Sequence, residues 1–159
     1  MRKSPATAPF VVLMAVLLLA ACSGSTSGSN PTEPVTQPTS VASVITAGTW
    51  TVGTLTQSTE DKSNQFSGYT FTFSRSGDAE AGTVTATKGG NTISGTWNHS
   101  AAVTYYGSTS TESMVLSLGA SSPFAMLTKT WNVVSNTAST LTLVSPELVE
   151  NMHLIFVKQ

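Results

Sequence analysis

Apolar residues alternate with serine and threonine through most of the chain after residue 40. A period of two, with many β-branched and aromatic residues, is typical of strands that have one buried and one solvent-facing side. The clearest example is residues 66–74, in which Tyr69, Phe71 and Phe73 share one face. The same pattern predicts further strands at 49–56, 82–87, 92–97, 102–106, 113–118, 131–135, 140–145 and 152–158.

Turn and helix signals separate these strands. Gly89 and Gly90 supply the positive φ angles of a tight hairpin. One stretch, residues 122–129, is interpreted as a short helix because Ser122 is a suitable N-cap and Pro123 suits the first helical position. The segment 145–148 has a similar start signal but lies between two strands, so we expect a loop there.

Eight or nine short strands joined mostly by tight turns indicate an all-β antiparallel meander. A sheet of this kind must protect its edges, and closure into a barrel removes them. We therefore expect a small β-barrel of about eight strands with one short helix. A β-sandwich remains the competing arrangement, because the sequence separates the two poorly.

The N-terminus has the layout of a secretory signal peptide. Arg2 and Lys3 precede an apolar run of 12 residues, 10–21, that ends in Ala20 and Ala21. A helix that spans a bilayer needs about 20 residues, so the run is too short for a permanent span. The sequence predicts a signal peptide over residues 1–21.

The only cysteine of the chain, Cys22, follows this run directly. The sequence Leu-Ala-Ala-Cys at 19–22 resembles the lipobox of bacterial lipoproteins. This resemblance implies cleavage between Ala21 and Cys22, a diacylglyceryl group on the Cys22 thiol, and an anchor in the membrane. By resemblance to the Gram-negative sorting rule, Ser23 favours the outer membrane, on its periplasmic side or at the cell surface. An ordinary signal peptide with a chance cysteine is the alternative.

Residues 22–40 have the composition of a tether. They are rich in glycine, serine, threonine and proline and contain one charged residue, Glu33. Such a segment buries too little apolar area to offset the entropy lost on ordering. Residues 41–159 then form one domain, long enough for a substantial core.

The charge balance excludes some partners. Without the signal peptide, 5 basic residues face 8 acidic ones, and charged residues make up only 9% of the chain. Soluble domains contain about 25% charged residues, so serine and threonine carry much of the solvent contact here. There is no basic patch, and we expect no binding of nucleic acid.

A threonine precedes each of the three tryptophans, Trp50, Trp97 and Trp131. They are interpreted first as anchors of a single core. Together with the lipobox and tether, the motifs GTW at 48–50, YTFTFS at 69–74, GTW at 95–97, TWNV at 130–133 and LIFVK at 154–158 resemble the small lipocalin-like lipoproteins common in Bacteroidetes.

This resemblance implies a lipocalin-like barrel. Gly48-Thr49-Trp50 also matches the G-x-W motif of lipocalins, in which the tryptophan closes the barrel floor against a late basic residue. The resemblance therefore implies that Trp50 and Lys158 form such a floor plug.

The sequence offers little for catalysis or metal binding. His99 and His153 are the only histidines, nothing in the sequence orients either, and a metal site needs three or four ligands. Glu60 and Asp61 are interpreted as residues of a solvated turn. Glu147 and Glu150 are interpreted in the same way, and Asp78 and Glu80 lie in a hairpin. No G-x-S-x-G elbow or phosphate-binding glycine loop is present. We expect no enzyme activity, no catalytic residues, no metal and no cofactor.

The leading hypothesis is a non-enzymatic lipoprotein whose barrel binds a small apolar ligand or an envelope protein at its mouth. A filled core that acts as a structural or interaction module is the alternative, and interior volume distinguishes the two. The residues predicted to line a cavity are Phe71, Phe73, Trp97, Met114, Leu116, Trp131 and Phe156.

Overall fold

The computed structural model describes residues 40–159. The predicted signal peptide, the predicted lipidation site Cys22 and residues 23–39 of the predicted tether lie outside this part. None of the helices in residues 40–159 is both long enough and apolar enough to cross a bilayer.

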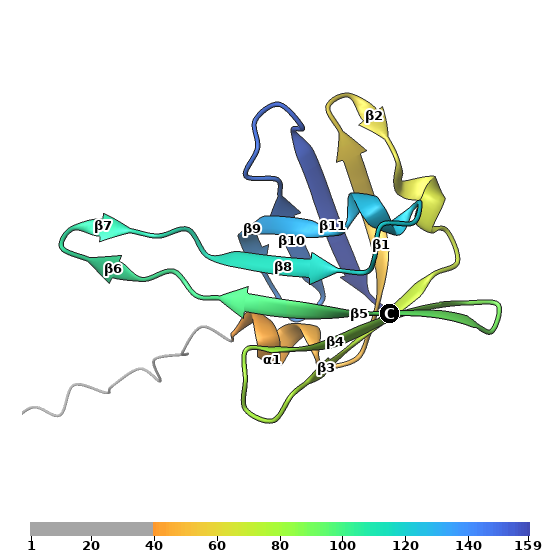
Figure 1. The fold of residues 1–159 in the computed structure, drawn as a ribbon, viewed down its shortest axis with the longest axis horizontal. Helices are drawn as coiled ribbons and strands as arrows, with labels where there is room; N and C mark the ends of the chain where they lie inside the picture. Colours follow the sequence, from red (N-terminus) through yellow and green to blue (C-terminus); the bar gives the residue numbers. More distant parts are fainter. Residues whose placement is uncertain (1–39) are drawn as a thin grey trace, which may run out of the picture. The chain divides into compact units, whose positions relative to one another are not determined.

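Eight antiparallel strands form a closed barrel (Figure 1). Each strand pairs with the next barrel strand in the sequence, and the last pairs with the first. This confirms the predicted all-β meander that closes into a barrel and rules out the sandwich. The barrel strands are β1 (Thr49–Gln57), β3 (Thr70–Arg75), β4 (Ala81–Lys88), β5 (Asn91–Ser100), β8 (Ser113–Ser117), β9 (Lys129–Asn136), β10 (Thr140–Val144) and β11 (Met152–Lys158).

The seams that β1 makes with its two neighbours differ in length. Seven register pairs join β1 to β11, from Trp50–Lys158 to Gln57–Met152. Only two pairs join β1 to β3, Thr49–Thr72 and Trp50–Phe71. Beyond them, a short strand β2 (Glu60–Asp61) and the following turn cover β1 instead. The Lys62 N–H donates to the Leu55 carbonyl at 2.7 Å, and the Leu55 N–H donates to the Ser63 hydroxyl at 2.8 Å.

The α-helix of the described residues is α1 (Val41–Ile45), not the predicted 122–129. Its Ser40 N-cap accepts a hydrogen bond from the Ser43 N–H at 3.2 Å. Val41, Ala42, Val44 and Ile45 are all buried. Packing against the barrel therefore stabilises a helix whose β-branched residues disfavour helix formation on their own.

At residues 122–129 the structure has a 3₁₀ helix of three residues, η2 (Phe124–Met126). Pro123, rather than Ser122, occupies the N-cap position, and no side chain caps the turn. The turn is instead closed by Thr128, whose hydroxyl donates to the carbonyls of Gly119 and Phe124 and accepts from the Leu118 N–H. These bonds hold the segment against the barrel without a full α-helical turn.

The strand predicted at 66–74 begins four residues later, at Thr70. Phe66 belongs to a 3₁₀ helix, η1 (Ser63–Phe66). Gly68 has a φ of +79°, which is incompatible with an extended strand, so β3 can begin only after it. The predicted alternation nevertheless holds from residue 70, since Phe71 and Phe73 are buried while Thr72 is exposed. The predicted Gly89-Gly90 hairpin is confirmed, with φ angles of +56° and +85° between Lys88 and Asn91.

The three tryptophans anchor the core, and each indole N–H donates to a backbone carbonyl. Trp50 donates to Ile45 at 2.7 Å, Trp97 to Ser74 at 3.1 Å, and Trp131 to Leu127 at 3.0 Å. All three are at most 2% exposed. Buried indoles need such partners, so each tryptophan also fixes the position of the segment whose carbonyl it binds.

Short helical segments close both ends of the barrel. At one end, here called the helix end, α1 packs over Trp50. At the other, here called the aromatic end, Phe66, Tyr69 and Phe124 form edge-to-face contacts with ring centroids 5.1–6.5 Å apart. The strand register puts the β3–β4 turn, the β9–β10 turn and the C-terminal end of β11 at the helix end.

Between β5 and β8 the chain extends away from the barrel as a two-stranded arm (Figure 1). Its strands are β6 (Thr104–Tyr105) and β7 (Ser108–Thr109). The predicted strand at 102–106 corresponds to β6, which is shorter. Here "the arm" denotes residues 101–111.

Candidate functional site

The seven residues predicted to line a cavity all lie together inside the barrel, and each is at most 2% exposed. Their aromatic rings pack on one another. The centroid of Phe156 is 5.3 Å from that of Phe71 and 5.8 Å from that of Phe73, which in turn lies 6.4 Å from Trp97. These side chains therefore fill space in the barrel core, and their role in lining a cavity stays a prediction.

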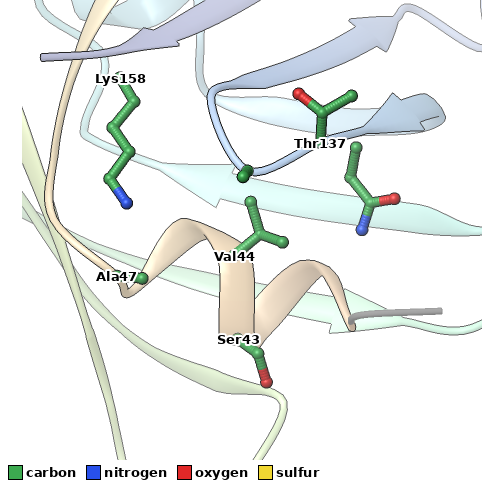
Figure 2. Close-up of a pocket in the computed structure, with 7 residues that line it drawn as sticks. Ser43, Val44, Ala47, Thr137 and Lys158 are labelled. Atoms are coloured by element: carbon green, nitrogen blue, oxygen red, sulfur yellow. The ribbon is translucent and has the colours of Figure 1, made fainter. Parts of the chain in front are cut away.

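Two pockets on the described residues lie outside this core, and none of the seven residues lines either one. The first, here called the helix-end pocket, has a volume of about 310 Å³. It lies between α1, the β9–β10 turn and the end of β11 (Figure 2). Its lining residues are Ser43, Val44, Ala47, Asn136, Thr137, Ala138 and Lys158.

Lys158 is the only charged residue among those that line the helix-end pocket. It lies opposite Trp50 in the β1–β11 register. In Figure 2 its side chain extends from β11 towards the side of the pocket formed by α1 and Ala47. The ammonium makes no hydrogen bond or ion pair with any residue of 40–159. The proposed floor plug of Trp50 and Lys158 stays a prediction.

Gly48 leaves room for the Lys158 side chain. A Cβ at this position would come within 2.8 Å of the Lys158 Cε, and the φ angle of +134° is one that other residues rarely adopt. The aliphatic stem of Lys158 therefore lies over a bare backbone, which directs its charged end along the pocket.

The second pocket, of about 330 Å³, is at the aromatic end and is more polar. Lys129 lines it and forms an ion pair with Glu150. The Lys129 ammonium also lies 3.3 Å from the Met152 sulfur and 5.9 Å from the centroid of Trp131. Glu150 lies in the loop as expected but is only partly exposed, because its carboxylate pairs with this lysine, whereas Glu147 is exposed as expected.

A polar cluster at the base of the arm was missed from the sequence. His99 is 6% exposed, and its Nδ1 lies 2.9 Å from Glu80 Oε2 while its Nε2 lies 2.8 Å from Glu112 Oε1. Arg75 forms an ion pair with the same Glu80. The expectation that nothing orients His99 is therefore wrong, because residues distant in sequence meet here through the β3–β4 turn and the start of β8.

These contacts position His99 at the barrel wall and fix the base of the arm. His153, by contrast, faces solvent on β11, as its alternation with Met152 and Leu154 predicts. Within residues 40–159, no group of three or more histidine, cysteine, aspartate or glutamate side chains is arranged to hold a metal ion.

The arm presents apolar side chains to solvent. Val103, Tyr105 and Tyr106 are 67%, 73% and 91% exposed, and the two tyrosine rings contact each other edge to face at 4.3 Å. No residue of the arm is charged. The arm is therefore an uncharged aromatic protrusion held at its base by the His99 cluster.

Comparisons with known proteins give one structural likeness. Japanin from Rhipicephalus appendiculatus, in a structure bound to cholesterol, is similar with a TM-score of 0.44 and 12% sequence identity. The match covers 72% of this chain and 76% of japanin. No protein-family model and no curated protein sequence matches the chain. Membership of the lipoprotein group that the sequence resembles stays a prediction.

Proposed function

We propose that this protein is a non-enzymatic, membrane-anchored lipoprotein that binds a small apolar ligand in the helix-end pocket. The observation that carries this proposal is a pocket that combines an apolar wall with the unpaired ammonium of Lys158. Its volume of about 310 Å³ lies at the lower end of the range for small-molecule sites, roughly 300–1,000 Å³. Val44, Ala47 and Ala138 supply apolar surface beside a few polar groups.

The proposed ligand site lies at one end of the barrel, outside its core, whereas the sequence predicted a ligand at the barrel mouth in a cavity lined by core residues. Interior side chains are packed at close-contact distances, and displacing them would cost the free energy of their burial. A ligand at the helix end needs no such rearrangement. The lipid on Cys22 would hold this barrel at the outer membrane or cell surface.

Ligand binding is tested by native mass spectrometry. The full-length chain is recovered from the envelope of the cells that produce it and is released from nanodiscs in the instrument. We expect an extra mass that disappears on denaturation. Ala138→Phe, which adds a ring at the exposed side of the pocket, should abolish it. Ala79→Phe is the matched control, because Ala79 is an exposed turn residue at the same end of the barrel. An extra mass that persists in Ala138→Phe contradicts the site, and no extra mass in the wild type contradicts the function.

The anchor is tested separately by labelling cells with a fatty-acid analogue. The wild type should be labelled and Cys22→Ala should not, because the thiol is the predicted attachment point. Labelling of Cys22→Ala would contradict lipidation at this residue.

A second function is favoured by the arm: binding of an envelope protein. Its exposed tyrosines resemble the rigid aromatic anchors that dominate protein interfaces. A photo-crosslinking residue at position 106 should then give a specific adduct in the intact envelope. The same residue at exposed position 91, in the β4–β5 hairpin at the opposite end of the barrel, should give none.

A further inference from the structure

We propose that the helix-end pocket selects short amphiphilic carboxylates, with the carboxylate on the Lys158 ammonium and the apolar part against Val44, Ala47 and Ala138. This inference rests on the proposed function, because it names the ligand class of the same pocket. It goes further by assigning a specificity-determining residue.

The first support is the environment of the lysines. Four lysines lie in residues 40–159, and three have partners: Lys62 pairs with Glu60, Lys129 pairs with Glu150, and the Lys88 ammonium lies 5.1 Å from the Tyr69 ring centroid. Lys158 is half-buried and has no such partner among these residues. A partly desolvated ammonium gains most from a ligand that brings an anionic oxygen acceptor.

The second support is that other polar groups of the pocket serve its own loops. The Thr137 hydroxyl accepts from the Thr140 N–H at 2.9 Å and bonds the Thr140 hydroxyl at 2.7 Å. The Ser43 hydroxyl bonds the Ser40 hydroxyl at 3.0 Å. Lys158 is therefore better suited than Ser43 or Thr137 to recognise a ligand's head group.

The third support is size. If each ligand heavy atom occupies about as much space as a water molecule in the liquid, roughly 30 Å³, the pocket holds about ten heavy atoms. Octanoate has about this size and combines one carboxylate with one short chain. A phosphate or acetate ion alone would leave the apolar wall uncovered.

The test uses the full-length chain in nanodiscs with labelled methyl groups on alanine and valine. Octanoate should shift the methyl signals of Val44, Ala47 and Ala138 saturably. Octanamide, its neutral analogue of the same length, should bind at least tenfold more weakly. Acetate, which has the head group alone, should not shift these methyl signals in the same concentration range.

The decisive variant is Lys158→Met, which keeps an aliphatic stem and removes the charge. We expect octanoate to bind about tenfold more weakly while octanamide binding stays unchanged. Lys88→Met is the matched control, because the Lys88 stem also lies over a glycine with positive φ, Gly68. It should bind octanoate like the wild type.

The outcomes separate the two levels of the proposal. Equal binding of octanoate and octanamide by the wild type overturns the carboxylate class but leaves the apolar site standing. If Lys158→Met weakens the binding of octanoate and octanamide equally, Lys158 acts by holding α1 in place, and this inference is also overturned. If neither ligand shifts the pocket methyls, both this inference and the proposed ligand site fail. If acetate alone is as effective as octanoate, the pocket binds simple anions and the amphiphile class is wrong.

Discussion

The two ends of the barrel carry pockets of nearly equal volume, about 310 Å³ and 330 Å³, and each contains one lysine. At the aromatic end Lys129 is neutralised by Glu150 and contacts the Trp131 ring. At the helix end Lys158 lies over a glycine and has no acidic partner among the described residues. Pocket volume alone therefore does not indicate a binding site. The two pockets differ in charge, because the Lys158 ammonium has no acidic partner among the described residues and the Lys129 ammonium has one.

The ends also resemble each other in how they are closed. In each, a buried tryptophan donates its indole N–H to the carbonyl of a short segment that covers the barrel: Trp50 to Ile45 and Trp131 to Leu127. The helix end is aliphatic and formed by one segment, whereas the aromatic end joins side chains from two.

The largest effect is expected from removing these tryptophans. Trp50→Ala and Trp131→Ala should each lower the free energy of unfolding by about 3–5 kcal/mol, because each leaves a large buried void and an unpaired carbonyl. Denaturant unfolding of both variants checks this. A loss below about 1 kcal/mol at either end would show that its tryptophan does not anchor the closing segment.

An intermediate effect is expected at the polar cluster beside the helix end. His99→Phe should cost about 1–3 kcal/mol, because Glu80 and Glu112 lose a hydrogen-bond partner at the barrel wall. Amide exchange in the arm should also accelerate. His153→Phe, at an exposed position on β11, is the control and should change stability by no more than about 0.5 kcal/mol. Unchanged exchange in His99→Phe would contradict a role in holding the arm.

A smaller effect on the free energy of unfolding is expected from replacing the two pocket lysines, Lys129 and Lys158. Lys129→Met should lower the free energy of unfolding by about 1 kcal/mol, because Glu150 loses its partner. Lys158→Met should leave stability within about 0.5 kcal/mol of the wild type, since no protein contact of the ammonium is lost. Thermal unfolding of the two variants gives the result. Equal losses would mean that Lys158 has a stabilising partner after all.

The smallest effect concerns pH at the aromatic end. The hydroxyl and backbone N–H of Ser63 hold the pKa of Asp61 below its usual range. A lowered pKa in the folded state stabilises the fold at pH values above the ordinary value of about 4, and this contribution is lost as pH falls further. Asp61→Asn should therefore flatten the dependence of the melting temperature on pH between about 3 and 5. An unchanged slope would assign the acid sensitivity to other groups.

The barrel was predictable because the alternation of apolar and polar residues continues through all eight strands. Met152–Lys158 has the predicted bounds, and its buried side follows the period of two. The α-helix was not recognised because β-branched residues in its five positions suggest extension. The spacing of its buried positions, 41, 42, 44 and 45, is helical and could have revealed it.

The candidate site was far less predictable. Of the residues that line the helix-end pocket, only Lys158 was singled out, and this came from a family resemblance. The others lie on α1, just after it, or at the β9–β10 turn, and only closure of the barrel brings these parts together. Likewise, Glu80 and Glu112 lie 19 and 13 residues from His99, and no local pattern links them.

The short seam of two register pairs between β1 and β3 determines where the barrel should first open locally. Every other seam of the barrel has at least four register pairs, so opening should begin at this junction, where the turn at Lys62 and Ser63 replaces strand pairing. The amide of Leu55, bonded there to a serine hydroxyl, should therefore exchange with solvent faster than the amides of the longer seams. A large apolar molecule could enter the barrel core only when this seam opens. The rate of seam opening, and not the rate of diffusion, would then limit its entry.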